Sequence, residues 1–289
     1  MSHAKDWLIF PENMGRRLSI DEVALSQGEL YTVLTNKKAK GRAGTIVAII
    51  EGTKADNVIA HLNKIPLEKR RQVKEITLDM APNMKLIART SFTRATQVID
   101  RFHVQKLASE ALQEIRIKYR WIAIDQENEA ILKAKERGVD YIPELLLTGE
   151  TRKQILARSR YLLYKSSEKW TIKQAIRAKV LFKEYPEIEQ AYKLSQELRL
   201  FFNTKTGKGI ALTKLAQWYD KVEKSGFKSF ATIMNTIRIN YEGIVNYFEH
   251  RSTNAAAESF NAKIKAFRSQ FRGVKNVAFF LFRLTKIYA

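Results

Sequence analysis

The sequence predicts a mixed α/β protein whose sheet-forming core is interrupted by a large all-α insertion. Short β-rich runs separated by turn signals fill residues 17–103. From 104 to 250 the apolar residues change to helical spacing, with no strand-like run among them. Two further helical segments follow. A chain of 289 residues is long enough for a core domain that carries an inserted one.

The expected core elements follow one another in the order β-β-β-α-β-α-β. The five expected strands span 17–24, 29–35, 45–50, 73–79 and 95–99. The expected helices span 53–63, with Thr53 as its N-cap, and 82–89. Short connections, including the hairpin signal Ser26–Gln27–Gly28, predict that the first three strands are antiparallel. This order is that of the ribonuclease-H-like fold, with a mixed five-stranded sheet.

Four parts are expected along the chain. They are an N-terminal extension (1–16), the first part of the core (17–103), the helical insertion (104–250) and C-terminal basic helices that complete the core (251–289). Helical spacing within the insertion predicts helices over 104–119 with an extension at 121–137, then 152–165, 171–184, 187–202 and 212–225. After it, we expect a helix over 255–268, capped by Asn254 and ended by Gly273, and another over 277–288.

The charge balance favours a polyanionic partner. The chain has 51 Lys and Arg against 30 Asp and Glu, which gives a formal net charge of +21. Nucleic acid is the first polyanion to consider, although ribosomal and membrane-surface proteins share this bias.

The composition also excludes several kinds of site. Because the chain has no cysteine, disulfides, Cys-ligated zinc and thiol catalysis are excluded. No transmembrane-length apolar run and no signal-peptide pattern is present. We therefore expect a cytoplasmic, nucleoid-associated protein.

Two strand-like runs each end on a carboxylate, Asp21 and Asp79. An acidic residue at the mouth of a buried strand is costly unless a cation lies beside it. In a basic protein, a divalent metal acting on a phosphodiester explains both positions, because such ions prefer carboxylate oxygens. The alternatives are that Asp79 is a turn residue before Pro82 and that Asp21 is a surface acid beside Glu22.

Glu258 is the candidate for a third carboxylate. It is the one acid after residue 250, against eight basic residues. The alternative is an intrahelical salt bridge with Lys263 or Lys265. Asn261 and Lys265 lie on the same helix face as Glu258, where Lys265 is expected to contact phosphate.

Together, these residues resemble the DDE transposases of bacterial insertion sequences. The motifs are Ile20–Asp21–Glu22, Leu78–Asp79–Met80, Asp100–Arg101–Phe102–His103–Val104 and Glu258–Ser259–Phe260–Asn261–Ala262–Lys263–Ile264–Lys265. The closest likeness is to the ISL-three-like branch, whose helix carries a similar Glu-x-x-Asn-x-x-Ile-Lys signature. The resemblance to this family extends over nearly the whole chain from Gly15 onward.

The resemblance implies a ribonuclease-H-like catalytic core, two Mg²⁺ or Mn²⁺ ions, and DNA cleavage and strand transfer at transposon ends. Asp21, Asp79 and Glu258 then form the metal-binding catalytic triad. The Asp100-x-x-His103 element is similar to a signature that lies near the active site in several DDE families. From the sequence alone, His103 can equally be a core histidine at a helix start, with Asp100 as its N-cap. Asp100 is also the main rival of Glu258 for the third carboxylate.

The expected partners are the DNA of the insertion-sequence ends and of the target, bound by a homodimer as the family implies. The expected DNA-binding residues are Asn261, Lys263, Lys265, Arg268, Arg272 and Lys275. In the insertion, Arg152, Lys153, Arg158 and Arg160 are either DNA contacts or a solvated face. Most aromatic residues of the insertion are expected to be core.

The chain departs from the family at its N-terminus. Family members carry a Cys-rich zinc element and a helix-turn-helix there, whereas this chain has no cysteine and about sixteen residues before its first strand motif. We therefore expect a separately encoded recognition protein, or else a truncated remnant. The alternative functions are a catalytically silent DNA-binding remnant of a transposase and a structure-specific nuclease on the same fold.

Overall fold

A computed structural model describes residues 6–25, 28–271 and 276–289. The chain divides into two compact units, of which unit 1 contains the residues up to His103 together with Asn240–Ala289. Unit 2 is Val104–Ile239. Residues 240–250, expected within the insertion, therefore group with unit 1.

Unit 1 is built around one six-stranded sheet with the strand order β1-β4-β3-β2-β5-β6. The strands are β1 (Trp7–Ile9), β2 (Arg17–Ala24), β3 (Leu30–Asn36), β4 (Ile46–Glu51), β5 (Glu75–Leu78) and β6 (Thr96–Ile99). Strands β1 to β4 pair antiparallel, whereas β5 lies parallel to β2 and β6 lies parallel to β5. The expectation of five strands was wrong, because β1 adds a sixth. A strand of three residues is too short to produce a recognisable alternation in the sequence.

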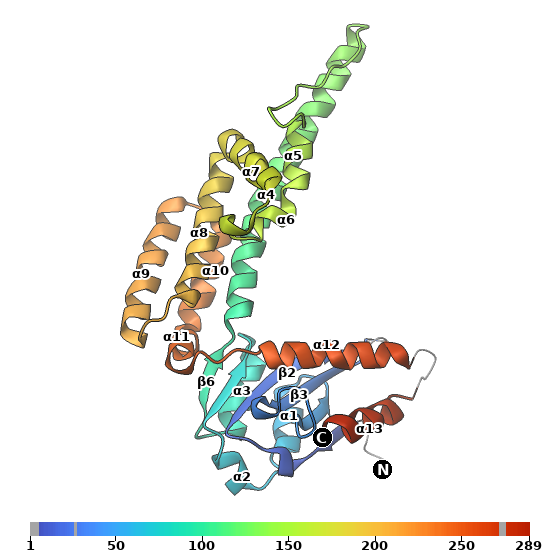
Figure 1. The fold of residues 1–289 in the computed structure, drawn as a ribbon, viewed down its shortest axis with the longest axis vertical. Helices are drawn as coiled ribbons and strands as arrows, with labels where there is room; N and C mark the ends of the chain where they lie inside the picture. The colour runs from blue at the N-terminus through green and yellow to red at the C-terminus, as the bar shows by residue number, and fades with distance from the viewer. Residues whose placement is uncertain (1–5, 26–27, 272–275) are drawn as a thin grey trace. The chain divides into compact units, whose positions relative to one another are not determined.

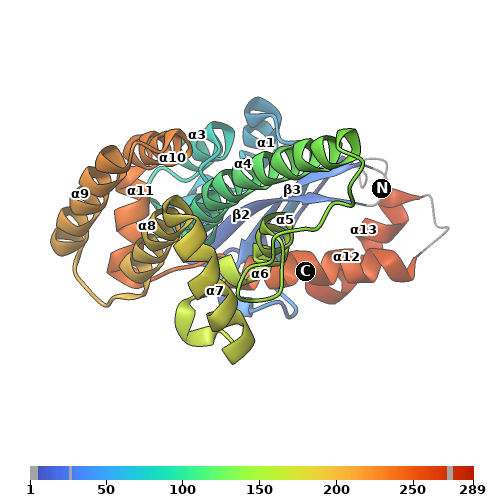
Figure 2. The same cartoon turned by 90° about the horizontal axis from the view of Figure 1, so that it is seen from above.

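Helices cover both faces of this sheet. Helices α1 (Ala55–Leu62) and α3 (Pro82–Ser91) lie on one face, and α12 (Ala255–Gln270) and α13 (Val277–Tyr288) lie on the other (Figures 1 and 2). The apolar side chains of α12 and α13 pack on those of β2, β3 and β4. This cluster includes Val23, Tyr31, Val33, Ile49, Phe260, Ile264, Phe280 and Leu284. The sheet is therefore shielded from water on both sides, except where its strands end.

Helix α11 (Tyr241–His250) packs against the edge strand β6. A Cβ atom on Gly243 would lie only 2.7 Å from Cγ1 of Ile99. Glycine at this position therefore lets the helix backbone approach the strand closely. Asn246 adds a hydrogen bond from its Nδ2 atom to the Gln97 carbonyl, at 2.9 Å.

Three expectations about element ends need correction or fall outside the described residues. Lys54, not Thr53, occupies the N-cap position of α1. Asn254 is the N-cap residue of α12 as expected, but its side chain makes no capping hydrogen bond. The expected turn residues Ser26, Gln27 and Gly273 lie outside the described residues. Unit 1 also contains the short helix α2 (Leu67–Arg71), which the sequence did not indicate.

Unit 2 is helical, and no strand occurs in it over the described range 104–239. Its helices are α4 (Arg101–Glu136, beginning in unit 1), α5 (Arg152–Arg158), α6 (Arg160–Leu163), α7 (Ile172–Glu184), α8 (Pro186–Asn203), α9 (Lys208–Ser225) and α10 (Lys228–Ile239). The helix expected over 152–165 is divided at Ser159, and α10 was not anticipated. Among the aromatic residues, Phe201, Phe202 and Trp218 are buried, whereas Tyr161 is exposed. No helix of the described residues has the length and apolar character needed to cross a membrane.

Candidate metal centre

Three aspartates follow one another across neighbouring strands. Ser19 of β2 pairs with Thr77 of β5, and Thr77 pairs with Val98 of β6. Two residues further along the chain are Asp21 in β2, Asp79 just after β5 and Asp100 just after β6. Because β2, β5 and β6 are neighbouring parallel strands, these three positions lie side by side at one edge of the sheet.

The sequence suggested that Asp21 ends its strand, but Asp21 lies within β2. Strand β2 continues to Ala24, because β3 pairs with it from Leu18 to Ala24, whereas the parallel neighbour β5 already stops at Leu78. Asp21 therefore lies on the part of β2 that extends beyond β5. The half-buried carboxylate of Asp21 is therefore on a part of β2 that has no partner in β5.

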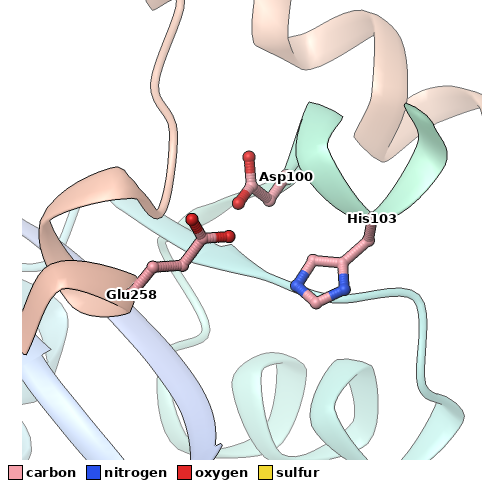
Figure 3. A group of neighbouring side chains, drawn as sticks. All are labelled: Asp100, His103 and Glu258. Carbon is pink, nitrogen blue, oxygen red and sulfur yellow. The ribbon is translucent and has the colours of Figure 1, made fainter. Parts of the chain in front are cut away.

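Asp100, His103 and Glu258 converge. Asp100 follows β6, His103 lies in the first turn of α4, and Glu258 lies in the first turn of α12. One potential ligand atom of each residue lies within 4.8 Å of those of the other two. Figure 3 shows the two carboxylates and the imidazole ring directed toward a common space. Both carboxylates also lie at helix N-termini, where the helix dipole favours negative charge.

Hydrogen bonds hold Asp100 without using all of its oxygen atoms. The Phe102 backbone N–H donates to Oδ1 at 3.3 Å, so Asp100 does cap α4. Its Oδ2 atom is buried without a hydrogen-bond partner, as is Oε1 of Glu258. The capping interpretation and a role in a metal site are therefore compatible, because they use different oxygen atoms.

The carboxylates of the cluster affect one another electrostatically. Burial raises the pKa of Asp21, and the charges of Asp79 and Asp100 raise it further, against the Glu22 N–H and His103. Burial likewise raises the pKa of Glu258, with Asp100 and Asp21 adding to the effect and His103 opposing it. Like charges that are partly withdrawn from water destabilise one another. Asp21, Asp79, Asp100 and Glu258 therefore lie near enough to interact electrostatically.

Glu22 is a further acid of this region that the sequence did not single out. Burial raises its pKa, followed by the charge of Asp79, while a hydrogen bond with Asn83 lowers it. Asp79 itself accepts a hydrogen bond from the Ala81 N–H at 2.9 Å, as expected of a turn aspartate. Asp79 is not one of the three residues whose ligand atoms converge, but it acts on both Asp21 and Glu22. Only the fold brings Asp79 near Asp21 and Glu22. The one hint in the sequence is that Glu22 directly follows Asp21.

The donor set fits a divalent cation. No Lys or Arg of the described chain lies within 4.0 Å of the Glu258 carboxylate, so the alternative of an intrahelical salt bridge is wrong. Lys263 instead donates to the Gly41 carbonyl at 3.1 Å. Buried carboxylate oxygens without partners are costly in the absence of a cation. Carboxylates suit Mg²⁺ and Mn²⁺, and the imidazole of His103 is a ligand that Mn²⁺ accepts more readily.

Comparison with known proteins identifies the family. Residues 18–284 match the family model of ISL3-type DDE transposases, described as "Transposase". The chain belongs to this family. It is 23% identical over 270 residues to the transposase for insertion sequence element IS1001 of Bordetella parapertussis, covering 92% of this chain and 59% of that protein. It is also 23% identical over 256 residues to the transposase for IS1557 of Mycobacterium tuberculosis, covering 86% of this chain and 55% of that protein.

The chain thus spans somewhat more than half the length of these two transposases. No solved structure matches it.

In this ISL3-type family member, the residues expected to contact DNA from α12 lie in different environments. Asn261 donates from Nδ2 to Oδ2 of Asp21 at 2.7 Å, and its own Oδ1 atom is buried without a partner. Arg268 is only 5% exposed, and its guanidinium lies 5.1 Å from the ring centroid of Phe280. Lys265 is exposed. Arg272 and Lys275 lie outside the described residues.

Proposed function

We propose that this chain is the catalytic portion of a transposase that carries out metal-dependent DNA cleavage and strand transfer at insertion-sequence ends. The observation that carries the proposal is the gathering of carboxylates from elements far apart in the sequence. Asp21 of β2 and Asp100 after β6 both act on the ionisation of Glu258 of α12, and Asp79 after β5 acts with Asp100 on Asp21. Membership of the DDE transposase family supports the same conclusion.

The core is proposed to be ribonuclease-H-like. The supporting features are the antiparallel β2–β3–β4 meander, followed by α1, the parallel strand β5, α3 and the parallel strand β6. Helix α12 then returns to the face of the sheet that carries Asp21. In this arrangement, the chain between β6 and α12 can be long without disturbing the site, because both of its ends lie in unit 1.

Asp21, Asp79 and Glu258 are proposed as the catalytic metal ligands, with Asp100 and His103 completing the environment. Two Mg²⁺ or Mn²⁺ ions, when bound, would activate the attacking water or hydroxyl and stabilise charge on the leaving oxygen. Asn261 and the Glu22 N–H each hold one oxygen of Asp21. The Phe102 N–H holds Oδ1 of Asp100 and leaves Oδ2 available. These contacts fix the directions of the oxygens before a substrate arrives.

The proposed substrates are the two double-stranded ends of the element and the target DNA. A net charge of +21 supports binding to a polyanion. Because two ends must be joined to one target, we propose that two copies of the chain act together on DNA. Recognition of the terminal repeats is proposed to come from a separately encoded protein or from a further segment.

The test is cleavage of terminal-repeat DNA, taken from the sequence flanking the gene, in the presence of Mg²⁺ or Mn²⁺. Asp21→Asn, Asp79→Ala and Glu258→Gln are each expected to abolish cleavage. Asp56→Asn, a change at an exposed acid of α1, is the matched control and should keep wild-type activity. Full cleavage by Asp79→Ala would contradict the proposed mechanism.

The products separate the alternative functions. Cleavage followed by joining to target DNA supports a transposase, whereas cleavage without joining under all conditions indicates a structure-specific nuclease. DNA binding without any metal-dependent cleavage, even with a recognition protein added, indicates a catalytically silent remnant.

A further inference from the structure

Unit 2 contains a buried arginine that has no carboxylate partner. Arg116 of α4 is 5% exposed, and its guanidinium donates from Nε to Oε1 of Gln113 at 2.6 Å and from Nη1 to the Leu156 carbonyl at 2.8 Å. Both acceptors are neutral. No Asp or Glu of the described residues lies within 4.0 Å of Arg116. A buried charge that is hydrogen-bonded but not neutralised remains costly.

Two more arginines lie close to Arg116. Arg120 follows it by one helical turn, on the same face of α4. Arg160 begins α6, and its carbonyl accepts a hydrogen bond from Nε2 of Gln113 at 3.3 Å. Burial lowers the pKa of Arg116, and the charges of Arg120 and Arg160 lower it further. The guanidinium groups of Arg120 and Arg160 therefore repel that of Arg116, while Tyr164 opposes the effect and no described carboxylate pairs with Arg116.

The other basic residues first considered as DNA contacts in unit 2 do have anionic partners. The ion pairs are Arg152 with Glu144 and Glu184, Lys153 with Glu127, and Arg158 and Arg177 with Glu150. These contacts account for Arg152, Lys153 and Arg158 as parts of the unit's own structure. Arg160 is different, because no described carboxylate pairs with it.

An exposed aromatic ring completes the group. The guanidinium carbon of Arg160 lies 5.5 Å from the ring centroid of Tyr161, whose side chain is 69% exposed. Arg199 of α8 donates from Nη2 to the Tyr164 carbonyl at 2.7 Å and also lacks a described carboxylate partner. Guanidinium groups match phosphate oxygens, and exposed rings beside them are common where proteins track a nucleic-acid strand.

We infer that Arg120 and Arg160, supported by Arg116 and Tyr161, form a DNA-backbone site in unit 2 that binds phosphates of the substrate, in addition to the metal centre of unit 1. The inference rests on the proposed function only for the choice of DNA as the polyanion. Arg120 and Arg160 are exposed and contact the phosphates directly. Arg116 adds positive charge from its buried position beneath the surface, and the ring of Tyr161 orients the Arg160 guanidinium.

The test is the binding of the full chain to a short, fluorescently labelled duplex of mixed sequence, measured with chelator over a range of salt concentrations. Arg120→Ala and Arg160→Ala are each expected to weaken binding by about 5- to 10-fold, and to lower the steepness of the salt dependence by about 0.9 per phosphate contact. Lys118→Ala is the matched control, because it removes the same charge from an exposed position of α4 on a different face. It should bind nearly as the wild type does.

The role of the ring is tested separately. Tyr161→Phe keeps the aromatic face and should bind normally, whereas Tyr161→Ala should resemble a mild form of Arg160→Ala. Thermal unfolding monitored by circular dichroism checks that all variants remain folded.

The inference is overturned if Arg120→Ala and Arg160→Ala bind with the affinity and salt dependence of Lys118→Ala. It is also overturned if the wild-type chain does not bind the duplex at low salt. Because cleavage is suppressed by the chelator, a failure of the proposed catalytic function leaves this result unaffected. Conversely, Asp79→Ala should lose cleavage yet bind the duplex normally.

Discussion

The Nδ2 atom of Asn261 lies 2.7 Å from Oδ2 of Asp21, a contact between residues 240 positions apart in the sequence. It joins α12 to the centre of β2. The other oxygen of Asp21 accepts the Glu22 N–H at 2.9 Å, so both oxygens are held in place. Asn261 also follows Glu258 by one helical turn. This side chain therefore links Glu258's helix directly to the carboxylate of Asp21, in addition to the apolar packing of α12 on the sheet.

Asn261→Ala is expected to reduce metal-dependent cleavage by about 10- to 100-fold and to raise the metal concentration needed for half-maximal activity, because the orientation of Asp21 is lost. The measurement is cleavage rate against Mn²⁺ concentration. Ser259→Ala, a change at an exposed residue of the same helix, is the matched control. Wild-type activity of Asn261→Ala at limiting Mn²⁺ would show that this hydrogen bond does not position a ligand.

The burial of the acids, together with the repulsion among them, predicts that the metal-free protein gains stability when one of them is neutralised. The folded-state pKa values of Asp21 and Glu258 are raised above the ordinary 3.8 and 4.5. The folded state then binds more protons than the unfolded state, so stability falls as pH rises from those ordinary values through the raised ones. Asp21→Asn and Glu258→Gln should therefore unfold at higher temperature than the wild type at neutral pH in chelator.

This advantage should vanish when the pH falls below the ordinary values, because all the acids are then protonated in both states. Thermal unfolding over a pH series measures it, with Asp56→Asn as the control. Variants that are less stable than the wild type at neutral pH in chelator would contradict the account that burial and mutual repulsion make these charges costly.

A buried ion pair lies at β5, the strand that Asp79 follows. Nζ of Lys37 lies 3.6 Å from Oε1 of Glu75 and donates to Oγ1 of Thr77 at 2.7 Å. Lys37→Met should lower the free energy of unfolding by about 2 to 4 kcal/mol, because it leaves the Glu75 carboxylate buried and unpaired. Urea unfolding measures the loss, and Lys38→Met, at an exposed neighbouring position, should be nearly neutral.

Adding Glu75→Gln to Lys37→Met tests the cause of that loss. The double variant should be more stable than the sum of the two single losses predicts, because no unpaired charge remains. Strict additivity would mean that the pair is not coupled.

The sequence predicted much of the core and part of the site. The order of the strands and helices could be predicted because alternation and turn residues are local signals, and helix α13 has the expected bounds. The convergence of Asp100 and Glu258 could not be predicted from spacing, because all of unit 2 separates them in the sequence and only the fold brings them together. Nor could the pairing of Asn261 with Asp21, because an asparagine beside basic residues on a helix resembles a phosphate contact.

The burial of Arg268 could not be predicted from the sequence either. A basic side chain near a helix end is usually solvated, and only α13 provides the ring of Phe280 over which this guanidinium lies. Conversely, β1 was missed because three residues give too little pattern.

Gly243→Ala should destabilise the protein by about 1 to 3 kcal/mol, because the added Cβ would overlap Ile99 and push α11 from β6. Chemical denaturation measures the change. Gly209→Ala is the matched control, since a Cβ at that helical position meets no atom within 4 Å and should be neutral or slightly stabilising. Equal stability of the two variants would contradict the close approach of α11. Since Ile99 precedes Asp100, cleavage activity should fall in Gly243→Ala as well.

The most direct test of the central claim is a crystal structure of the chain grown with Mn²⁺ and measured at a wavelength where manganese scatters anomalously. The account predicts anomalous density within coordination distance of Asp21 and Glu258, with Asp79 ligating the same or a neighbouring ion. The absence of bound Mn²⁺ at saturating concentration would contradict it. So would an ion held by Asp100, His103 and Glu258 while Asp21 and Asp79 remain uncoordinated.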